Sequence, residues 1–127
     1  MKSAHTQTVL VVEDNKRLGE AYQKLLINAG YVVRVANDAR EAQEVVASLT
    51  PDLILLNVDL PQTSGLKFLA SLAPLKSRPG KVVIVTDNDD ETTITEAYRL
   101  GVEHYMVKKW VSPYGILQLV KNTLGTR

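Results

Sequence analysis

The chain has 127 residues, a formal net charge of +1 at pH 7 and no cysteine. This length supports a single domain with one hydrophobic core. The balanced charge argues against a nucleic-acid-binding domain, and the absence of cysteine excludes a disulfide scaffold, a thiolate metal site and a cysteine nucleophile. The sequence has no signal-peptide pattern, and its apolar runs are far shorter than the ~20 residues that a membrane span requires. We therefore expect a soluble cytoplasmic domain that binds neither nucleic acid nor membrane.

Residues 1–7 are polar and predict a loose N-terminal tail, which is followed by a domain over residues 8–124. Within that domain, short apolar runs alternate with stretches in which apolar residues recur at helical spacing. Uninterrupted apolar runs bounded by loop residues are typical of strands buried on both faces. The predicted strands cover residues 8–12, 31–36, 53–56, 81–86 and 104–108, and the predicted helices begin near residues 16, 38, 65, 89 and 112 and end near residues 30, 49, 72, 100 and 124.

This alternation predicts a parallel sheet with helices on both faces, joined by right-handed crossovers. The expected fold is therefore an α/β fold of three layers with five strands and five helices. Residues 73–80 form a loop-rich segment that contains Pro74 and Pro79.

Polar residues stand at the carboxyl ends of four predicted strands. Glu13 and Asp14 follow the first strand, Asn57 and Asp59 the third, Thr86 and Asp87 the fourth, and Lys108 and Lys109 the fifth. Because the carboxyl ends of parallel strands lie side by side, these groups should meet at one edge of the sheet. Clustered carboxylates suit a hard cation such as Mg²⁺, and an amine with a hydroxyl could hold the outer oxygens of a phosphoryl group. Each residue alone could simply solvate a loop, but the complete set indicates a site.

Four motifs together resemble the receiver domain of two-component response regulators. They are Val-Leu-Val-Val-Glu-Asp-Asn at residues 9–15, Pro-Asp-Leu-Ile-Leu-Leu-Asn-Val-Asp-Leu-Pro at 51–61, Ile-Val-Thr at 84–86 and Gly-Val-Glu-His-Tyr-Met-Val-Lys at 101–108. The resemblance extends from about Thr8 to Leu124. It implies a flavodoxin-like (CheY-like) α/β/α sandwich with strand order 2-1-3-4-5. It also implies Mg²⁺ binding and phosphoryl transfer from a histidine kinase to an aspartate.

The resemblance assigns roles to individual residues. It makes Glu13 and Asp14 the acidic metal-binding pair, Thr86 the switch hydroxyl, Tyr105 the switch aromatic and Lys108 the site lysine. The backbone carbonyl of Asp59 would be a further metal ligand. The phosphoacceptor position falls on Asn57, so the metal set would be Glu13, Asp14, Asn57 and Asp59. An amide oxygen is a weak nucleophile that forms no stable acyl phosphate, so we expect this position to be degenerate.

Two further departures from the family pattern modify the predicted pocket. Asp87 follows the switch hydroxyl, where the family usually has a small residue, and would repel an anionic phosphodonor. Lys109 follows the site lysine in place of the family's usual proline. Since a non-proline cis bond costs about 2.5–4 kcal/mol, we expect a trans bond and a reshaped loop. The spacing to Ser112 leaves Lys109 as an alternative for the site lysine. The loop should bury Trp110, although a role as a partner contact also fits.

Loss of the acceptor carboxylate would leave Lys108 without its customary partner. Asp87 or Asp59 could supply the missing charge, or Asp87 could point into water. Asp59 could also act as a substitute phosphoacceptor, but the family directs the side chain at this position outward.

We therefore predict a pseudo-receiver, which is a phosphorylation-independent interaction module without enzymatic activity and with weakened Mg²⁺ binding. Its expected partners are a histidine kinase or a downstream signalling protein, with homodimerisation through the face of helix 4, strand 5 and helix 5 as a further option. The alternative is an ordinary receiver seen as an engineered Asp→Asn variant, or one phosphorylated at Asp59. A nucleotide- or flavin-binding protein would need a glycine- or hydroxyl-rich loop after the first strand, which residues 13–16 do not provide.

Overall fold

The computed structural model describes residues 6–72 and 80–125. Most of the predicted tail (residues 1–5) and of the predicted proline-containing loop (residues 73–79) lies outside this part of the chain. The strands are β1 (Thr8–Val12), β2 (Val32–Ala36), β3 (Leu53–Leu56), β4 (Lys81–Thr86) and β5 (His104–Val107). The helices are α1 (Lys16–Asn28), α2 (Ala39–Ser48), α3 (Gly65–Leu72), α4 (Glu91–Arg99) and α5 (Pro113–Leu124), with a short 3₁₀ helix, η1 (Lys108–Trp110), between β5 and α5.

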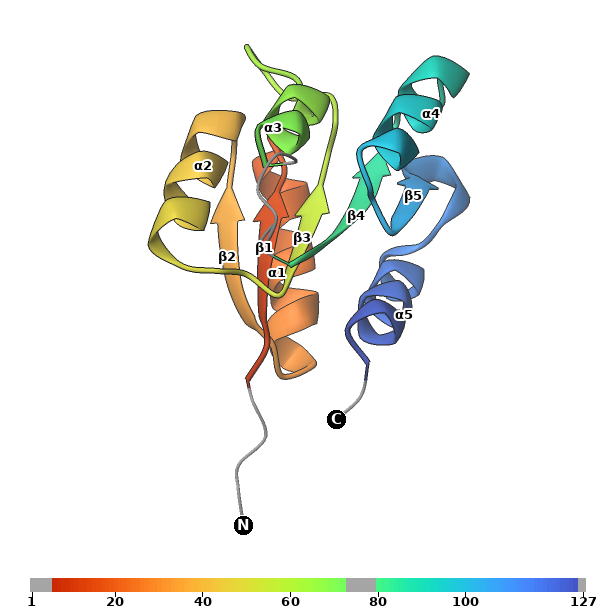
Figure 1. The fold of residues 1–127 in the computed structure, drawn as a ribbon. Coiled ribbons are helices and arrows are strands. Elements are labelled where there is room, and N and C mark those ends of the chain that lie inside the picture. Colours follow the sequence, from red (N-terminus) through yellow and green to blue (C-terminus); the bar gives the residue numbers. More distant parts are fainter. Residues whose placement is uncertain (1–5, 73–79, 126–127) are drawn as a thin grey trace.

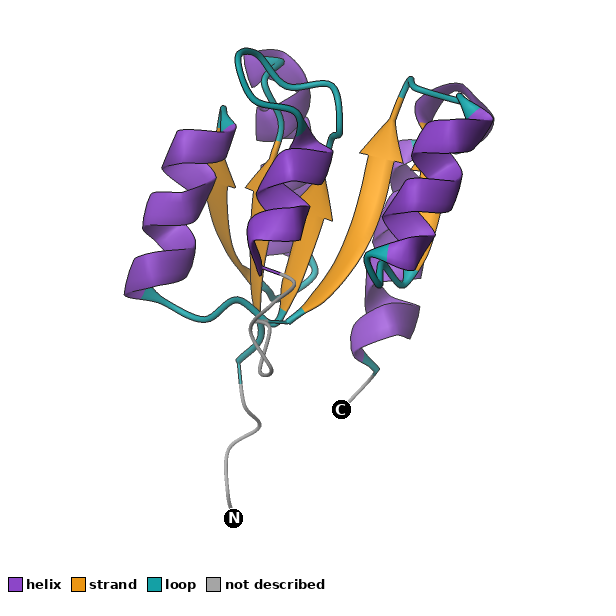
Figure 2. Cartoon of the chain, turned by 45° about the horizontal axis from the view of Figure 1, so that its top comes forward, coloured by secondary structure: helices purple, strands orange, loops and turns teal. Residues whose placement is uncertain are grey.

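The strands form one parallel sheet in the order β2-β1-β3-β4-β5. Helices α2, α3 and α4 cover one face of this sheet, and α1 and α5 cover the other (Figures 1 and 2). The predicted fold is confirmed in its layers, strand order and number of elements. The order places β1 and β3 at the centre, with their carboxyl ends next to each other and to β4.

Two hydrophobic clusters hold the layers together, one on each face of the sheet. The first joins the sheet to α2, α3 and α4, and Phe68 is fully buried in it. The second joins the sheet to α1 and α5 through Tyr22, Leu26 and Ile116. Alternate residues of β1 and β3 point into opposite clusters, which explains why these strands are apolar throughout.

Side chains at the helix ends fix where each loop turns. Asn15, Asp38, Asp90 and Ser112 each accept a hydrogen bond from a backbone N–H of the first helical turn. Gly30 adopts a φ of 102°, the left-handed conformation predicted for the end of α1. None of the helices in the described part of the chain is long and apolar enough to cross a membrane.

The end of β5 differs from the sequence prediction. The strand ends at Val107, and Lys108 begins the 3₁₀ helix. This turn leaves the Trp110 side chain 68% exposed, so the prediction that the loop buries Trp110 was wrong. The 3₁₀ helix between β5 and α5 thus presents Trp110 at the surface rather than under the loop.

Gly65 brings α3 against the end of β3. Its N–H donates to the carbonyl of Val58 at 2.8 Å. A Cβ at this position would lie 2.5 Å from the Asn57 carbonyl oxygen and 2.7 Å from the Val58 Cα, which is too close for any side chain. Only glycine therefore lets the helix start directly beside Asn57.

Candidate functional site

The end of β1 carries the most deeply buried carboxylate of the candidate site. Glu13 is only 2% exposed, and its backbone N–H donates to the Ala36 carbonyl at 3.0 Å. The Glu13 carbonyl accepts from Asn37 Nδ2 at 3.0 Å, so β2 and its following loop fix both backbone groups. Glu13 Oε2 also accepts from the backbone N–H of Asn15 at 3.1 Å. Asp14, the next residue, is exposed.

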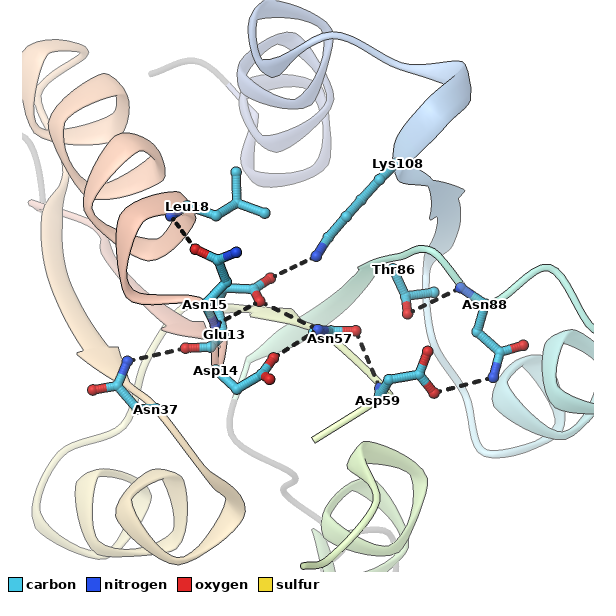
Figure 3. Close-up of polar contacts among 10 residues, drawn as sticks. All are labelled: Glu13, Asp14, Asn15, Leu18, Asn37, Asn57, Asp59, Thr86, Asn88 and Lys108. Atoms are coloured by element: carbon cyan, nitrogen blue, oxygen red, sulfur yellow. Dashed lines mark hydrogen bonds and ion pairs between the residues drawn. The ribbon is translucent and has the colours of Figure 1, made fainter. Parts of the chain in front are cut away.

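Asn57 lies between these two carboxylates (Figure 3). Its Nδ2 donates to Glu13 Oε2 at 3.3 Å and to Asp14 Oδ1 at 3.2 Å. Its Oδ1 accepts from the backbone N–H of Asp59 at 3.1 Å. The opposite amide orientation would place an oxygen against two carboxylates and a nitrogen against an N–H, so the hydrogen-bond network determines this orientation. The amide nitrogen, rather than the oxygen, thus faces the acidic pair.

Lys108 provides the positive charge of the site. Its Nζ lies 3.0 Å from Glu13 Oε1, and its side chain is 16% exposed. Lys109 points away, is 62% exposed and lies 3.6 Å from an Asp89 carboxylate oxygen. The structure therefore places Lys108, and not Lys109, in the site.

Lys108 pairs with a carboxylate other than the two that could have replaced the charge of the acceptor, Asp87 and Asp59. Within the described part of the chain, Lys108 forms an ion pair with Glu13 and none with Asp87 or Asp59. Lys108 pairs with Glu13 because this carboxylate is nearer and more buried than the other two. A buried charge is stabilised most by a close opposite charge. Asp87 is exposed, which agrees with the alternative in which it points into water.

The side chains of the site line an open, polar cavity of about 250 Å³. Four carboxylates and one ammonium group line it, so the cavity is acidic. The lining residues are Glu13, Asp14, Asn15, Asn57, Asp59, Asp87 and Lys108. The structure thus brings the predicted residues of β1, β3 and β5 together at one edge of the sheet.

Thr86 and Tyr105 lie on the other side of this edge and contact Asn88 instead of Asn57. Thr86 is fully buried, and its Oγ1 accepts from the backbone N–H of Asn88 at 3.3 Å. The Tyr105 hydroxyl donates to the Asn88 carbonyl at 2.7 Å. Asp59 also turns toward Asn88, because its Oδ1 accepts from Asn88 Nδ2 at 3.2 Å (Figure 3). Asn57 and Asp59 both lie beyond the end of β3, so a continuous strand does not set their relative orientation.

The pKa values of two tyrosines are raised by burial and by the negative charge around the site. Burial raises the pKa of Tyr22 to about 12, and the carboxylates of Glu13 and Asp87 add to the shift. Burial likewise raises the pKa of Tyr105 to about 12, with further contributions from Asp59 and the acidic residues that precede α4. Both phenols therefore stay protonated at neutral pH.

The arrangement of these groups lacks the full set of oxygen ligands that tight binding of a divalent cation requires. A hard cation needs several oxygen ligands, but the group that faces both carboxylates is the Asn57 amide nitrogen. Asn57 Oδ1, the oxygen that could replace it, already accepts from Asp59 N–H. Within residues 6–72 and 80–125, no group of three or more His, Cys, Asp and Glu side chains is placed to hold a metal ion.

Sequence reasoning missed Asn88, Asn37 and Tyr22. Asn88 is typical of a turn before a helix, and Tyr22 belongs to the apolar face of α1. Only the folded chain shows that Asn88 contacts Thr86 at the end of β4, Asp59 after β3 and Tyr105 in β5. It also shows that Tyr22 packs beneath Glu13 and Asn57. The four polar residues from Asp87 to Asp90 have the length of an ordinary loop, so the local sequence gave no signal for these contacts.

Comparison with known proteins identifies the family. The family model of the response regulator receiver domain matches residues 9–121. Protein CcdB of Bacillus subtilis is 28% identical over 118 residues, which cover 92% of this chain and 97% of that protein. The nitrate/nitrite response regulator NarL of Escherichia coli is 30% identical over 110 residues, which cover 85% of this chain but only 50% of NarL.

Solved structures agree with this match. A CheY-like receiver domain from Methanospirillum hungatei superposes with a TM-score of 0.88 at 23% identity and covers 94% of each chain. The phosphorylated cyanobacterial phytochrome response regulator RcpA has a TM-score of 0.80 at 27% identity, over 93% of this chain and 91% of that chain. The strand order, the acidic pair after β1 and the lysine after β5 occur here together with a family match over most of the chain. The chain therefore belongs to the response regulator receiver domain family.

Proposed function

We propose that this receiver domain is a pseudo-receiver that signals through protein contacts without being phosphorylated. The observation that carries the proposal is the Asn57 amide, whose nitrogen donates to both carboxylates of the acidic pair. Phosphoryl transfer needs an anionic oxygen at this position, and the only oxygen of the Asn57 side chain is neutral and already hydrogen-bonded.

The charge of the cavity supports the same conclusion. Asp14, Asp59 and Asp87 line it, and among the described residues the only lysine that lines it is paired with Glu13. A phosphodonor is an anion, and it would enter this acidic cavity without a cation that is free to neutralise it. We expect no phosphoryl transfer and no other enzymatic turnover.

Phosphorylation at Asp59 is the second candidate, because this carboxylate is exposed and lines the same cavity. Its Oδ1 accepts from Asn88 and faces away from Lys108, whose ammonium is paired with Glu13. An attacking Asp59 would therefore lack the positive charge that stabilises a transferring phosphoryl group. An ordinary receiver seen with an engineered Asn57 remains the other alternative, although it leaves Asp87 and Lys109 unexplained.

We also propose weak Mg²⁺ binding. An ion would have to displace the amide nitrogen of Asn57 and compete with Lys108 for Glu13. Two carboxylates remain, which supports weak binding rather than none. Calorimetry at neutral pH should show no binding in the micromolar range; tight binding would contradict this part of the proposal.

The partners we propose are proteins: a histidine kinase, a downstream signalling protein, or a second copy of the chain. The α4–β5–α5 face supports this, because Tyr98 and Tyr114 on it are about half exposed or more. Exposed aromatic side chains are common anchors in protein interfaces.

Intact mass after incubation with Mg²⁺ and acetyl phosphate tests the function. We expect no added phosphoryl mass on the chain with Asn57 and a labelled fraction on the Asn57→Asp variant. Asp59→Asn is the control that identifies the second candidate. Labelling of the natural chain that disappears with Asp59→Asn would establish Asp59 as the acceptor and overturn the proposal. Labelling that persists in that variant would overturn it as well.

A further inference from the structure

Asn88, in the loop between β4 and α4, uses all four of its polar groups in hydrogen bonds. Its backbone N–H donates to Thr86 Oγ1 at 3.3 Å, and its carbonyl accepts from the Tyr105 hydroxyl at 2.7 Å. Its side-chain Nδ2 donates to Asp59 Oδ1 at 3.2 Å, and its Oδ1 accepts from the backbone N–H of Asp90 at 3.0 Å. One residue therefore connects the segment after β3, the end of β4 and the Tyr105 side chain of β5.

These bonds form a continuous chain from Asn57 to Tyr105. Asn57 Oδ1 accepts from Asp59 N–H, Asp59 Oδ1 accepts from Asn88 Nδ2, and the Asn88 carbonyl accepts from the Tyr105 hydroxyl (first two bonds in Figure 3). No step of this chain involves an ion or a phosphoryl group. Tyr105 in turn contacts α4, because its backbone N–H donates to the Tyr98 hydroxyl at 3.1 Å.

We propose that Asn88 is a positioning residue, whose side-chain bond to Asp59 holds Tyr105 and the β4–α4 loop in a single arrangement without a phosphoryl group. The inference rests on the proposed pseudo-receiver function and explains what keeps the α4–β5 surface of the domain in one conformation. We call the bond between Asn88 Nδ2 and Asp59 Oδ1 the loop clasp.

The β4–α4 loop is bonded to Thr86 on one side and to Asp59, after β3, on the other. Thr86 is buried at the end of β4, and its hydroxyl anchors the Asn88 backbone. The loop clasp is the bond from the loop to the residues after β3, and it joins an amide donor to an ionised acceptor. Such charge-assisted bonds are stronger than neutral ones. Without it, the Asn88 carbonyl that receives the Tyr105 hydroxyl would lose its link to β3.

A reversal of the two polar groups tests the clasp. Asn88→Asp keeps the side-chain oxygen that accepts from Asp90 but replaces the donor with a carboxylate facing Asp59. Asp59→Asn added to Asn88→Asp restores an amide–carboxylate pair with the opposite polarity. Asn28→Asp, at an exposed position on α1, is the control for added negative charge. All variants are examined unphosphorylated by ¹⁵N and aromatic ¹³C NMR, with hydrogen exchange of the Tyr105 amide.

We expect Asn88→Asp to shift the Tyr105 ring resonances and to speed exchange of its amide about tenfold, the loss typical of one hydrogen bond to a charged group. The reversed pair should return both values close to those of the natural chain, and Asn28→Asp should change neither. Unchanged Tyr105 signals in Asn88→Asp would overturn the clasp, and so would a reversed pair that fails to restore them. Because no phosphodonor is present, neither result depends on whether the chain can be phosphorylated.

Discussion

Replacement of Asn57 by aspartate should destabilise the domain and make its stability depend on Mg²⁺. In the natural chain, Asn57 Nδ2 lies 3.3 Å from Glu13 Oε2 and 3.2 Å from Asp14 Oδ1. The variant replaces this donor with an anionic oxygen, so two hydrogen bonds to carboxylates become two repulsive contacts. Lys108 is paired with Glu13 and can offset only part of this new charge.

The magnitude follows from the geometry. Like charges about 4 Å apart repel by about 4 kcal/mol at the effective dielectric constant of a partly buried site. Attraction to Lys108 and uptake of a proton by the new carboxyl group reduce this cost. We therefore expect a net loss of about 2–4 kcal/mol in unfolding free energy in EDTA. For a domain of this length, that loss corresponds to a fall of roughly 8–15 °C in melting temperature.

Mg²⁺ should restore much of this loss in the variant, since an ion at 100 times its Kd stabilises by about 2.7 kcal/mol. Thermal melts in EDTA and in a Mg²⁺ series provide the measurement. Gln43→Glu, the same amide-to-acid change on the exposed face of α2, is the matched control and should respond little to Mg²⁺. An Asn57→Asp variant as stable in EDTA as the natural chain would refute the reasoning, as would an equal Mg²⁺ response in both chains.

Three other predictions concern single contacts. Lys108→Met should lower the unfolding free energy, measured by urea denaturation, by about 2–4 kcal/mol because it leaves the Glu13 carboxylate buried without its cation. Lys109→Met should lower it by less than about 0.5 kcal/mol. Equal effects of the two substitutions would contradict the assignment of Lys108 to the site. Gly65→Ala should lower the unfolding free energy by about 2–3 kcal/mol, because the new Cβ would clash with the Asn57 carbonyl. Gly19→Ala is the control. Its Cβ would lie 3.4 Å from the nearest side-chain atom, so the unfolding free energy should stay the same or rise by up to about 1 kcal/mol. The folded state raises the pKa of Tyr22 from 10.0 to about 12 and so holds its proton more tightly than the unfolded chain. The stability this contributes is complete below pH 10 and is lost as pH rises toward 12, and Tyr22→Phe should flatten the fall; an unchanged pH profile would contradict it.

The fold could be predicted from the sequence because its signals are local. Apolar runs such as residues 53–56 define buried strands, and residues such as Asp38 and Ser112 mark helix starts through bonds within one turn. The convergence of Glu13, Asn57 and Lys108 followed from the parallel topology alone. The end of β5 was less predictable, because nothing in the local pattern distinguishes a final strand residue from the first residue of a 3₁₀ turn.

The contacts within the site depended on three-dimensional detail that residue types do not contain. Charge alone could not choose among Glu13, Asp59 and Asp87 as the partner of Lys108, because that choice depends on burial and reach. The orientation of the Asn57 amide was equally hidden, since the same side chain can present either a donor or an acceptor. Asn88 looked like an ordinary turn residue because its partners are 29 and 17 residues away in sequence.

In this protein, hydrogen bonds link the strand ends without a metal ion or a phosphoryl group. An NMR titration of the natural chain with Mg²⁺, followed by beryllium fluoride as a phosphoryl analogue, tests it most directly. We predict that the amides of Asn57, Thr86 and Tyr105 keep their positions throughout, with only small, unsaturated shifts at Asp14 from weak Mg²⁺ binding. A saturating response to Mg²⁺, or a second set of signals at Thr86 and Tyr105 with beryllium fluoride, would contradict the account.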